Sequence, residues 1–110
     1  MIRSEAKAQQ NQLSDAITDL DVIRQRAGLP AVSTTNPTIN QTELLKLIYN
    51  ERRLEFFAER GLRWFDLRRL HEADPVLKPL KQNWDTTDQL YPIPLSELKL
   101  NSFLKQNAGY

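Results

Sequence analysis

Residues 49–70 read YNERRLEFFAERGLRWFDLRRL, and this stretch decides the fold. Ten charged and four aromatic side chains stand between Glu51 and Arg69. Placed at about 100° per residue, the apolar side chains before Gly61 recur on one face of a helix. The pattern predicts a helix over 41–60, a break at Gly61 and a second helix over 62–71.

Two carboxylates lie on the face of the first helix that ought to be buried. Glu51 and Glu55 fall in the same sector as the apolar side chains Leu44, Leu47, Ile48 and Ala58. Like charges four residues apart repel each other, and a buried unpaired charge destabilises a fold by several kcal/mol. Opposite charges must therefore neutralise these carboxylates inside the fold.

The sequence offers the arginines that follow Gly61 as partners. A guanidinium group forms two hydrogen bonds with a carboxylate and also stacks on aromatic rings. We therefore expect a helical hairpin, bent at Gly61, around a half-buried structural ion-pair network. Its expected members are Glu51, Arg52, Glu55, Arg63, Asp66, Arg68 and Arg69, with rings from Phe56, Phe57, Trp64 and Phe65. Loss of Arg63 and Arg68 is expected to loosen the domain.

Another helix is expected before the hairpin. Apolar side chains at steps of three and four predict it over 4–27, and Gly28 is a natural residue to follow its C-terminus. The proline- and threonine-rich segment 29–40 predicts a loop. Asn40 or Thr42 is expected to cap the helix of the hairpin.

Prolines shape the rest of the chain. Pro75 and Pro79 limit 72–82 to one or two helical turns, and the Pro-Ile-Pro run at 92–94 forces an extended stretch. Ser96 can then cap a single helical turn. The predicted fold class is all-α, with a helix, a helical hairpin and a long irregular C-terminal tail.

Composition excludes several classes of function. The 110 residues suffice for a single domain over 1–110, with 40% apolar and 26% charged residues. The formal net charge of +1 gives no field that favours nucleic acid, so no nucleic-acid partner is expected. With no cysteine and one histidine, His71, no metal site or cofactor is expected. The N-terminus lacks the apolar core of a signal peptide, and no apolar run is long enough to span a membrane.

Two groups of side chains suggest chemical roles as alternatives to packing. Glu51 and Glu55 lie roughly 6 Å apart on a helix, near the separation in retaining glycosidases. The neighbouring arginines favour the ionised carboxylate, which is wrong for a general acid, so no enzyme is expected. Trp84 and Tyr91 can either stack on a sugar ring or pin the tail onto the helices, and packing is the favoured interpretation.

Several linked motifs resemble the SusD/RagB family signature. They are ERR at 51–53, EF at 55–56, Glu59, Gly61 and RWFDLRR at 63–69. Three further stretches match in order, namely DVIRQRAGL at 21–29, LYPIP at 90–94 and QNAGY at 106–110. The resemblance covers about residues 13–110.

The resemblance implies a surface-exposed lipoprotein of the bacterial outer membrane. Such proteins bind glycans or other nutrients and act with a SusC-like TonB-dependent transporter that imports them. They are not enzymes, and their fold contains tetratricopeptide-like helix pairs. This chain is expected to be a fragment of the C-terminal region, without the signal peptide and lipidation cysteine of the parent.

A second class of function is an alternative to nutrient binding. The apolar face of 13–27 and the ring of Phe57 are expected to lack cover within the chain. Exposed apolar surface drives association. The alternative is therefore a stand-alone helical module that forms a homo-oligomer or binds a protein, without binding sugar.

Overall fold

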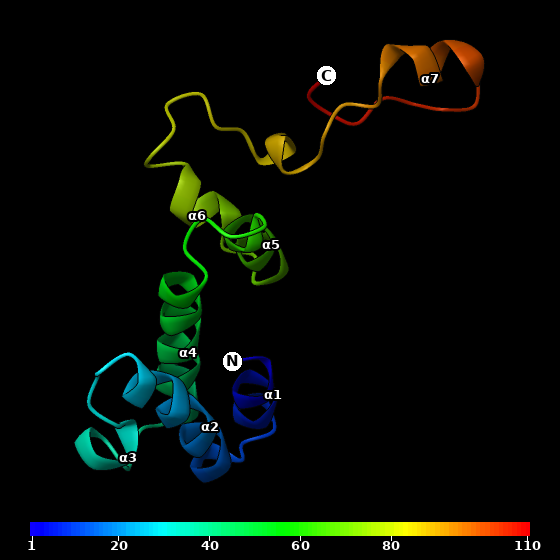
Figure 1. Ribbon diagram of the computed structural model, residues 1–110. Coiled ribbons are helices and arrows are strands. Elements are labelled where there is room, and N and C mark those ends of the chain that lie inside the picture. Colours follow the sequence, from blue (N-terminus) through cyan, green and yellow to red (C-terminus); the bar gives the residue numbers. More distant parts are fainter. The chain divides into compact units, whose positions relative to one another are not determined.

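The computed structural model describes residues 1–110 as helices joined by turns, which confirms the predicted all-α class (Figure 1). Contacts group the chain into two compact units, Met1–Glu59 and Arg60–Tyr110. The first unit contains α1 (Ile2–Gln9), α2 (Leu13–Arg26), α3 (Val32–Thr35) and α4 (Gln41–Glu55). The second contains α5 (Leu62–Arg69), α6 (Ala73–Leu77), the 3₁₀ helix η1 (Thr86–Gln89) and α7 (Leu95–Leu100). The single domain expected over 1–110 stays a prediction.

The helix predicted over 4–27 is in fact two helices, so the predicted continuity is wrong. Asn11 has a positive φ of 61° and stands in the turn between α1 and α2. Asparagine is one of the few residues other than glycine that adopt this conformation readily. The turn folds α1 onto α2, where the Ser4 hydroxyl donates to the Ala16 carbonyl oxygen at 2.8 Å. Both residues are fully buried.

Gly28 follows the C-terminus of α2, as predicted. Its φ is 72°, and its N–H donates to the Gln25 carbonyl oxygen at 3.0 Å. The N–H of Leu29 donates to the Arg24 carbonyl oxygen at 2.8 Å. These two bonds form a Schellman motif, which satisfies carbonyl groups that the last turn would otherwise leave open.

The predicted loop at 29–40 contains α3, which the sequence analysis missed. The carboxylate of Asp21 accepts from the Val32 N–H at 2.6 Å and from the Ser33 N–H at 3.1 Å. These are N–H groups at the start of α3 that lack partners within the helix. A buried side chain from α2 therefore fixes the start of α3.

Asn40 caps α4 as predicted, since its Oδ1 accepts from the Glu43 N–H at 3.0 Å. The helix ends at Glu55 rather than at the predicted Arg60. Ala58 and Arg60 have positive φ values of 59° and 46°, which a helix does not accommodate. The chain therefore turns before Gly61, so the break extends over several residues.

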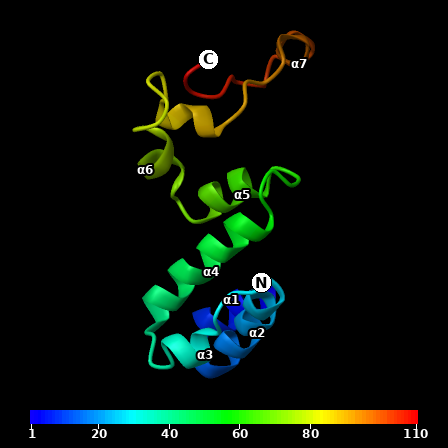
Figure 2. The ribbon, with the colours of Figure 1, turned by 60° about the vertical axis from the view of Figure 1, so that its left-hand side comes forward.

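The core of the first unit forms where α1, α2 and α3 gather beside α4 (Figure 2). Its buried side chains are Ala8, Ala16, Ile17, Leu20, Val32, Ile39, Leu44 and Ile48. Because the apolar face of α2 contributes to this core, the expectation that the face at 13–27 lacks cover is wrong. Gln41 of α4 also donates to the Ala8 carbonyl oxygen at the end of α1, at 2.8 Å.

In the second unit, α5 follows Gly61, whose φ is 66°. Leu67 of α5 and Ala73 of α6 are buried. The short α6 agrees with the limited helix predicted over 72–82. The predicted cap at Ser96 is wrong, because α7 begins at Leu95 and its N-cap residue is Pro94, without a side-chain cap.

Two distant segments of the tail, 90–94 and 106–110, are joined by hydrogen bonds. Gln106 donates through Nε2 to the Ile93 carbonyl oxygen at 3.0 Å and accepts from the Ile93 N–H at 2.8 Å. The amide side chain thus pairs with the backbone as a neighbouring strand would. Further bonds run from Asn107 Nδ2 to the Tyr91 oxygen at 2.7 Å and from the Tyr110 hydroxyl to the Leu90 oxygen at 2.8 Å.

Candidate functional site

A buried ion pair joins α2 to α4 in the first unit. The Arg24 guanidinium donates through Nη1 to Glu51 Oε1, and the two side chains are 15% and 10% exposed. Arg24 also donates through Nε to the Pro30 carbonyl oxygen at 2.9 Å. Glu51 is therefore buried and neutralised, as the helical pattern required.

A second pair, Arg26 with Glu55, lies one turn farther along α4. Its arginine side chain is 64% exposed and its glutamate side chain 28% exposed. Solvent screens such a pair, so it contributes little to stability beside its buried neighbour. The two carboxylates each have an arginine of their own.

Arg24 and Arg26 were not predicted from the sequence as partners of these carboxylates. A signal was present for Arg24, which stands four residues after the buried Leu20 and therefore on the same face of α2. The expected pairing of Glu51 and Glu55 with arginines after Gly61 would join the two units, and it stays a prediction. The expected contact of an arginine with a ring occurs at the C-terminal end of α4, where Arg52 Cζ lies 5.4 Å from the ring centroid of Phe56, the C-cap residue.

The expected network also has members within α5. Asp66, which is buried, accepts from Arg69 Nε at 2.8 Å, one helical turn farther along α5. Arg68 Cζ lies 5.9 Å from the Trp64 ring centroid. The short helix α5 thus carries one carboxylate–guanidinium pair and one guanidinium–ring contact.

Trp84 fastens the segment after α6 to the helices. Its ring meets that of Trp64 edge to face, with centroids 6.1 Å apart, and its Nε1 donates to Asp74 Oδ1 at 2.8 Å. Gln89 donates to the other Asp74 oxygen at 3.0 Å. The packing role predicted for Trp84 is confirmed, and stacking of its ring on a ligand stays a prediction.

The Tyr91 ring does not pack as predicted. Its side chain is 76% exposed, so the prediction that its ring pins the tail to the helices is wrong. The backbone carbonyl of Tyr91 makes the attachment instead, through Asn107. Stacking of the exposed Tyr91 ring on a sugar stays a prediction.

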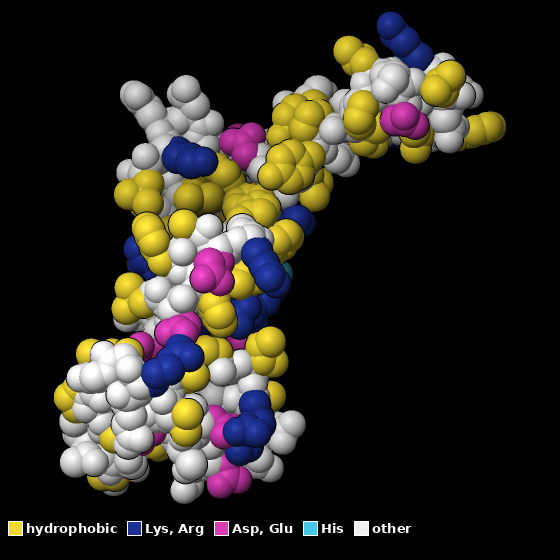
Figure 3. Space-filling view, viewed as in Figure 1, with side chains coloured by type: hydrophobic (Ala, Val, Ile, Leu, Met, Phe, Trp, Pro, Cys, Tyr) yellow, Lys and Arg dark blue, Asp and Glu magenta, His cyan; other side chains and the backbone are white.

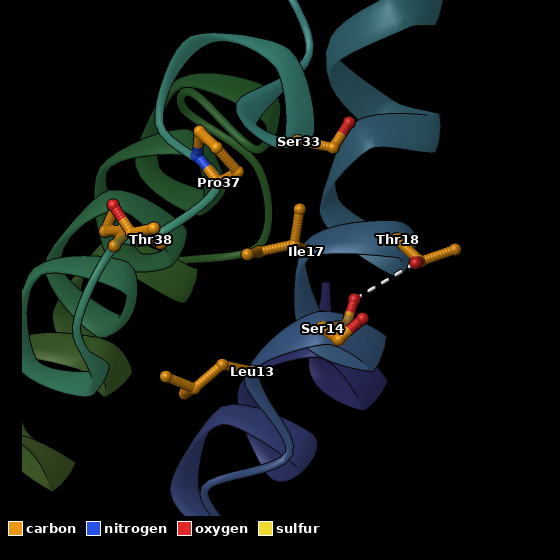
Figure 4. A pocket seen from close by; sticks show the side chains of 8 residues that line it. Leu13, Ser14, Ile17, Thr18, Ser33, Pro37 and Thr38 are labelled. Carbon is orange, nitrogen blue, oxygen red and sulfur yellow. Dashed lines mark hydrogen bonds between the residues drawn. The ribbon is translucent and has the colours of Figure 1, made fainter.

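A hollow of about 340 Å³ lies in the first unit between α2 and the segment that follows α3 (Figure 4). Four lining side chains carry hydroxyl groups, namely Ser14, Thr18, Ser33 and Thr38, and four are apolar, namely Leu13, Ile17, Pro37 and Ile39. Figure 4 shows Ile17 reaching from α2 toward Pro37 and Thr38. None of these residues was predicted from the sequence as a site, although Ser14 and Thr18 stand one helical turn apart.

A protein-family model described as the SusD family matches residues 1–89. The chain belongs to the SusD family. The resemblance of the signature motifs to SusD/RagB proteins is thereby confirmed. A SusD-like protein of Formosa agariphila is 36% identical over 116 residues, which cover all of this chain and 22% of that relative. This SusD-family chain therefore spans about a fifth of the length of the curated relative it matches. No solved structure matches it.

Two kinds of feature are absent from this SusD-family chain. No helix has both the length and the apolar character needed to cross a lipid bilayer. No group of three or more His, Cys, Asp or Glu side chains is arranged to hold a metal ion.

Proposed function

We propose that this chain is the C-terminal part of a protein that binds a glycan or another nutrient at the bacterial surface. That protein acts with a SusC-like TonB-dependent transporter in uptake and is anchored in the outer membrane as a lipoprotein. It captures its ligand without covalent chemistry and passes it to the transporter.

Membership of the SusD family carries this proposal, through the match over residues 1–89. The identity of 36% extends over the whole chain, so both units take part in the likeness. The proposal of binding without catalysis also fits Glu51 and Glu55, the best candidates for an acid–base pair. Each of them is engaged by its own arginine.

Deletion and co-purification test this proposal together. An affinity tag on the protein that carries this sequence is expected to recover a SusC-like transporter from detergent-solubilised outer membranes. Deletion of its gene is expected to slow growth on one glycan and leave growth on glucose unchanged. Recovery without a transporter, together with unchanged growth on every glycan tried, would contradict the proposal.

A second function, self-association, is favoured by exposed apolar side chains. Phe57 is 79% exposed at the end of the first unit. In the second unit, Leu100 is 83% exposed and Phe103 93% exposed, and hydrophobic side chains gather around α7 (Figure 3). Apolar surface of this kind commonly covers itself by association.

Sedimentation velocity separates this alternative from the first proposal. A self-associating module sediments as a dimer or larger oligomer, and Phe103→Ser shifts it toward the monomer. Thr86→Ser, at an exposed polar position of the same unit, is the matched control. A monomer at every protein concentration rules the alternative out.

A further inference from the structure

Two hollows adjoin along α2 in the first unit. The hollow of about 340 Å³ shares Thr18 and Ser33 with a second one of about 240 Å³, which continues toward Val22 and Gln25. We call the two together the α2–α3 groove. From Leu13 to Gln25 the helix rises roughly 18 Å at 1.5 Å per residue. The groove is therefore long enough for a ligand of two or three sugar rings.

The walls of the α2–α3 groove mix hydroxyl and apolar groups. The Ser14 and Thr38 hydroxyls and the Gln25 side-chain amide can each donate and accept a hydrogen bond. The Thr18 hydroxyl already donates to the Ser14 carbonyl oxygen at 3.0 Å, and the Ser33 hydroxyl donates to the Asp21 carboxylate, so these two offer acceptor oxygens to a ligand. Ile17 and Pro37 add aliphatic surface between them. A chain of sugar rings presents the same alternation, with hydroxyl groups around each ring and C–H groups on its faces. This mixture is typical of sites that bind small polar ligands.

Charge narrows the class of ligand. None of the eight side chains of the larger hollow is charged, and Asp21 is the one charged side chain of the smaller hollow. Burial alone would raise the pKa of Asp21, but hydrogen bonds from the Ser33 hydroxyl and from the Val32 and Ser33 N–H groups outweigh it and lower that pKa. The carboxylate is therefore ionised at neutral pH and repels an anionic ligand.

The α2–α3 groove is formed before any ligand arrives. Ile17 and Ile39 of its floor are 5% and 8% exposed and belong to the core of the unit. Asp21 holds the Ser33 side of the groove through the bonds to Val32 and Ser33. A preformed site binds without first ordering its own groups. Asp21 is thus a positioning residue, because it acts through α3.

We infer that the α2–α3 groove binds a short neutral oligosaccharide, with hydroxyl groups of the sugar on Ser14, Thr18 and Ser33 and its C–H faces on Ile17 and Pro37. The choice of a sugar among neutral ligands rests on the proposed function. The groove contains no aromatic ring. Affinity is therefore low, with a dissociation constant on the order of 1 mM.

Amide chemical shifts of the ¹⁵N-labelled chain provide the test, with maltotriose and laminaritriose as neutral probes and trigalacturonate as the anionic probe. At least one neutral trisaccharide is expected to shift the amides of Ser14, Thr18 and Ser33. Trigalacturonate is expected to leave those amides unchanged. Shifts confined to residues outside the groove, shifts with the anionic probe alone, or no shifts with any probe would overturn the inference.

Thr18→Arg fills the junction of the two hollows from an exposed helix position and is expected to weaken binding of the neutral probe at least about tenfold. Thr86→Arg makes the same replacement at an exposed position of the second unit and is expected to leave binding unchanged. If the spectrum of Thr18→Arg shows unfolding, Ser33→Ala takes its place, with an expected loss of about threefold. Equal binding by the folded groove variant and the parent chain would overturn the inference.

The outcome is independent of the test of the proposed function. If the growth and co-purification results are as expected but the groove variant binds the sugar as the parent chain does, only the groove inference is refuted. Binding in the groove without any effect of gene deletion on growth refutes the uptake role alone.

Discussion

The guanidinium of Arg24 meets the carboxylate of Glu51 where α2 passes α4, with both side chains largely buried. The same guanidinium reaches the Pro30 carbonyl oxygen at 2.9 Å. One side chain therefore links α2, the turn after it and α4. The pair lies beside the core and fixes how the helices of the first unit dock.

Removal of Arg24 is expected to destabilise the first unit strongly. Arg24→Met leaves Glu51 buried without its partner, and the free energy of unfolding is expected to fall by about 3 kcal/mol. Helical circular dichroism during urea unfolding measures this change. The double variant Arg24→Met/Glu51→Leu is expected to recover most of the loss, because it leaves no unpaired buried charge. A single variant as stable as the parent chain would refute the argument.

Removal of Arg26 tests the role of burial with a matched pair. The Arg26–Glu55 pair joins the same two helices but is much more exposed. Arg26→Met is therefore expected to lower the free energy of unfolding by only about 0.5 kcal/mol. If Arg26→Met destabilises the chain as much as Arg24→Met does, the exposure of an ion pair does not determine its contribution to stability here.

The predicted contact between Glu55 and the arginines after Gly61 has a direct test. A double-mutant cycle with Glu55→Gln and Arg63→Ala is expected to give a coupling energy of about 1 kcal/mol if the two side chains interact. Unfolding followed by circular dichroism supplies the four free energies. Strict additivity would show that Glu55 and Arg63 do not interact.

Acid is expected to weaken the attachment of α1 to α2. Hydrogen bonds from Arg3 and Lys7 lower the pKa of Asp19 from 3.8 to about 2. Because the pKa is lower in the folded chain, the stabilisation is complete above about pH 4 and is lost as the pH falls toward about 2. Urea midpoints across that range are expected to fall less steeply for Asp19→Asn than for the parent chain. Parallel curves would contradict the assignment.

Two glycines provide a matched comparison of backbone strain and steric conflict. Gly28 has a φ of 72° and open space around its α-carbon, so Gly28→Ala is expected to lower stability by about 1 kcal/mol. Gly109 has a φ of 96°, and a β-carbon there would collide with the Thr87 side chain. Gly109→Ala is therefore expected to release the C-terminal residues from η1. Faster hydrogen exchange at the Ile93 amide, with an unchanged rate in Gly28→Ala, would show this release.

Local rules determined much of the helical pattern. The spacing of apolar side chains identified α4 and α5, Asn40 was recognised as a cap and Gly28 as the residue after α2. These features depend on groups within a few residues of one another, so a sequence contains nearly all the information they need. The buried carboxylate of Glu51 was found in the same way, because a charge on an apolar face needs only the period of the helix.

The helix bounds that were predicted wrongly lie where the backbone preference is small or where residues distant in sequence decide the conformation. Asn11 separates α1 from α2 without the glycine or proline that usually indicates a break. The α4 helix stops at Glu55 although the apolar period continues beyond it. In both places the local preference for helix is weak enough for packing to override it.

Residue pattern alone was enough to predict a helical chain, to identify the SusD-family signature and to show that two carboxylates of one helix need cationic partners. The packing of the helices was needed to show that Arg24 and Arg26 are those partners, and that α2, α3 and the segment after α3 line the α2–α3 groove. The reason is physical: many arginines satisfy the charge of a carboxylate equally well. The choice among them, like the shape of a hollow, follows from the way the helices pack.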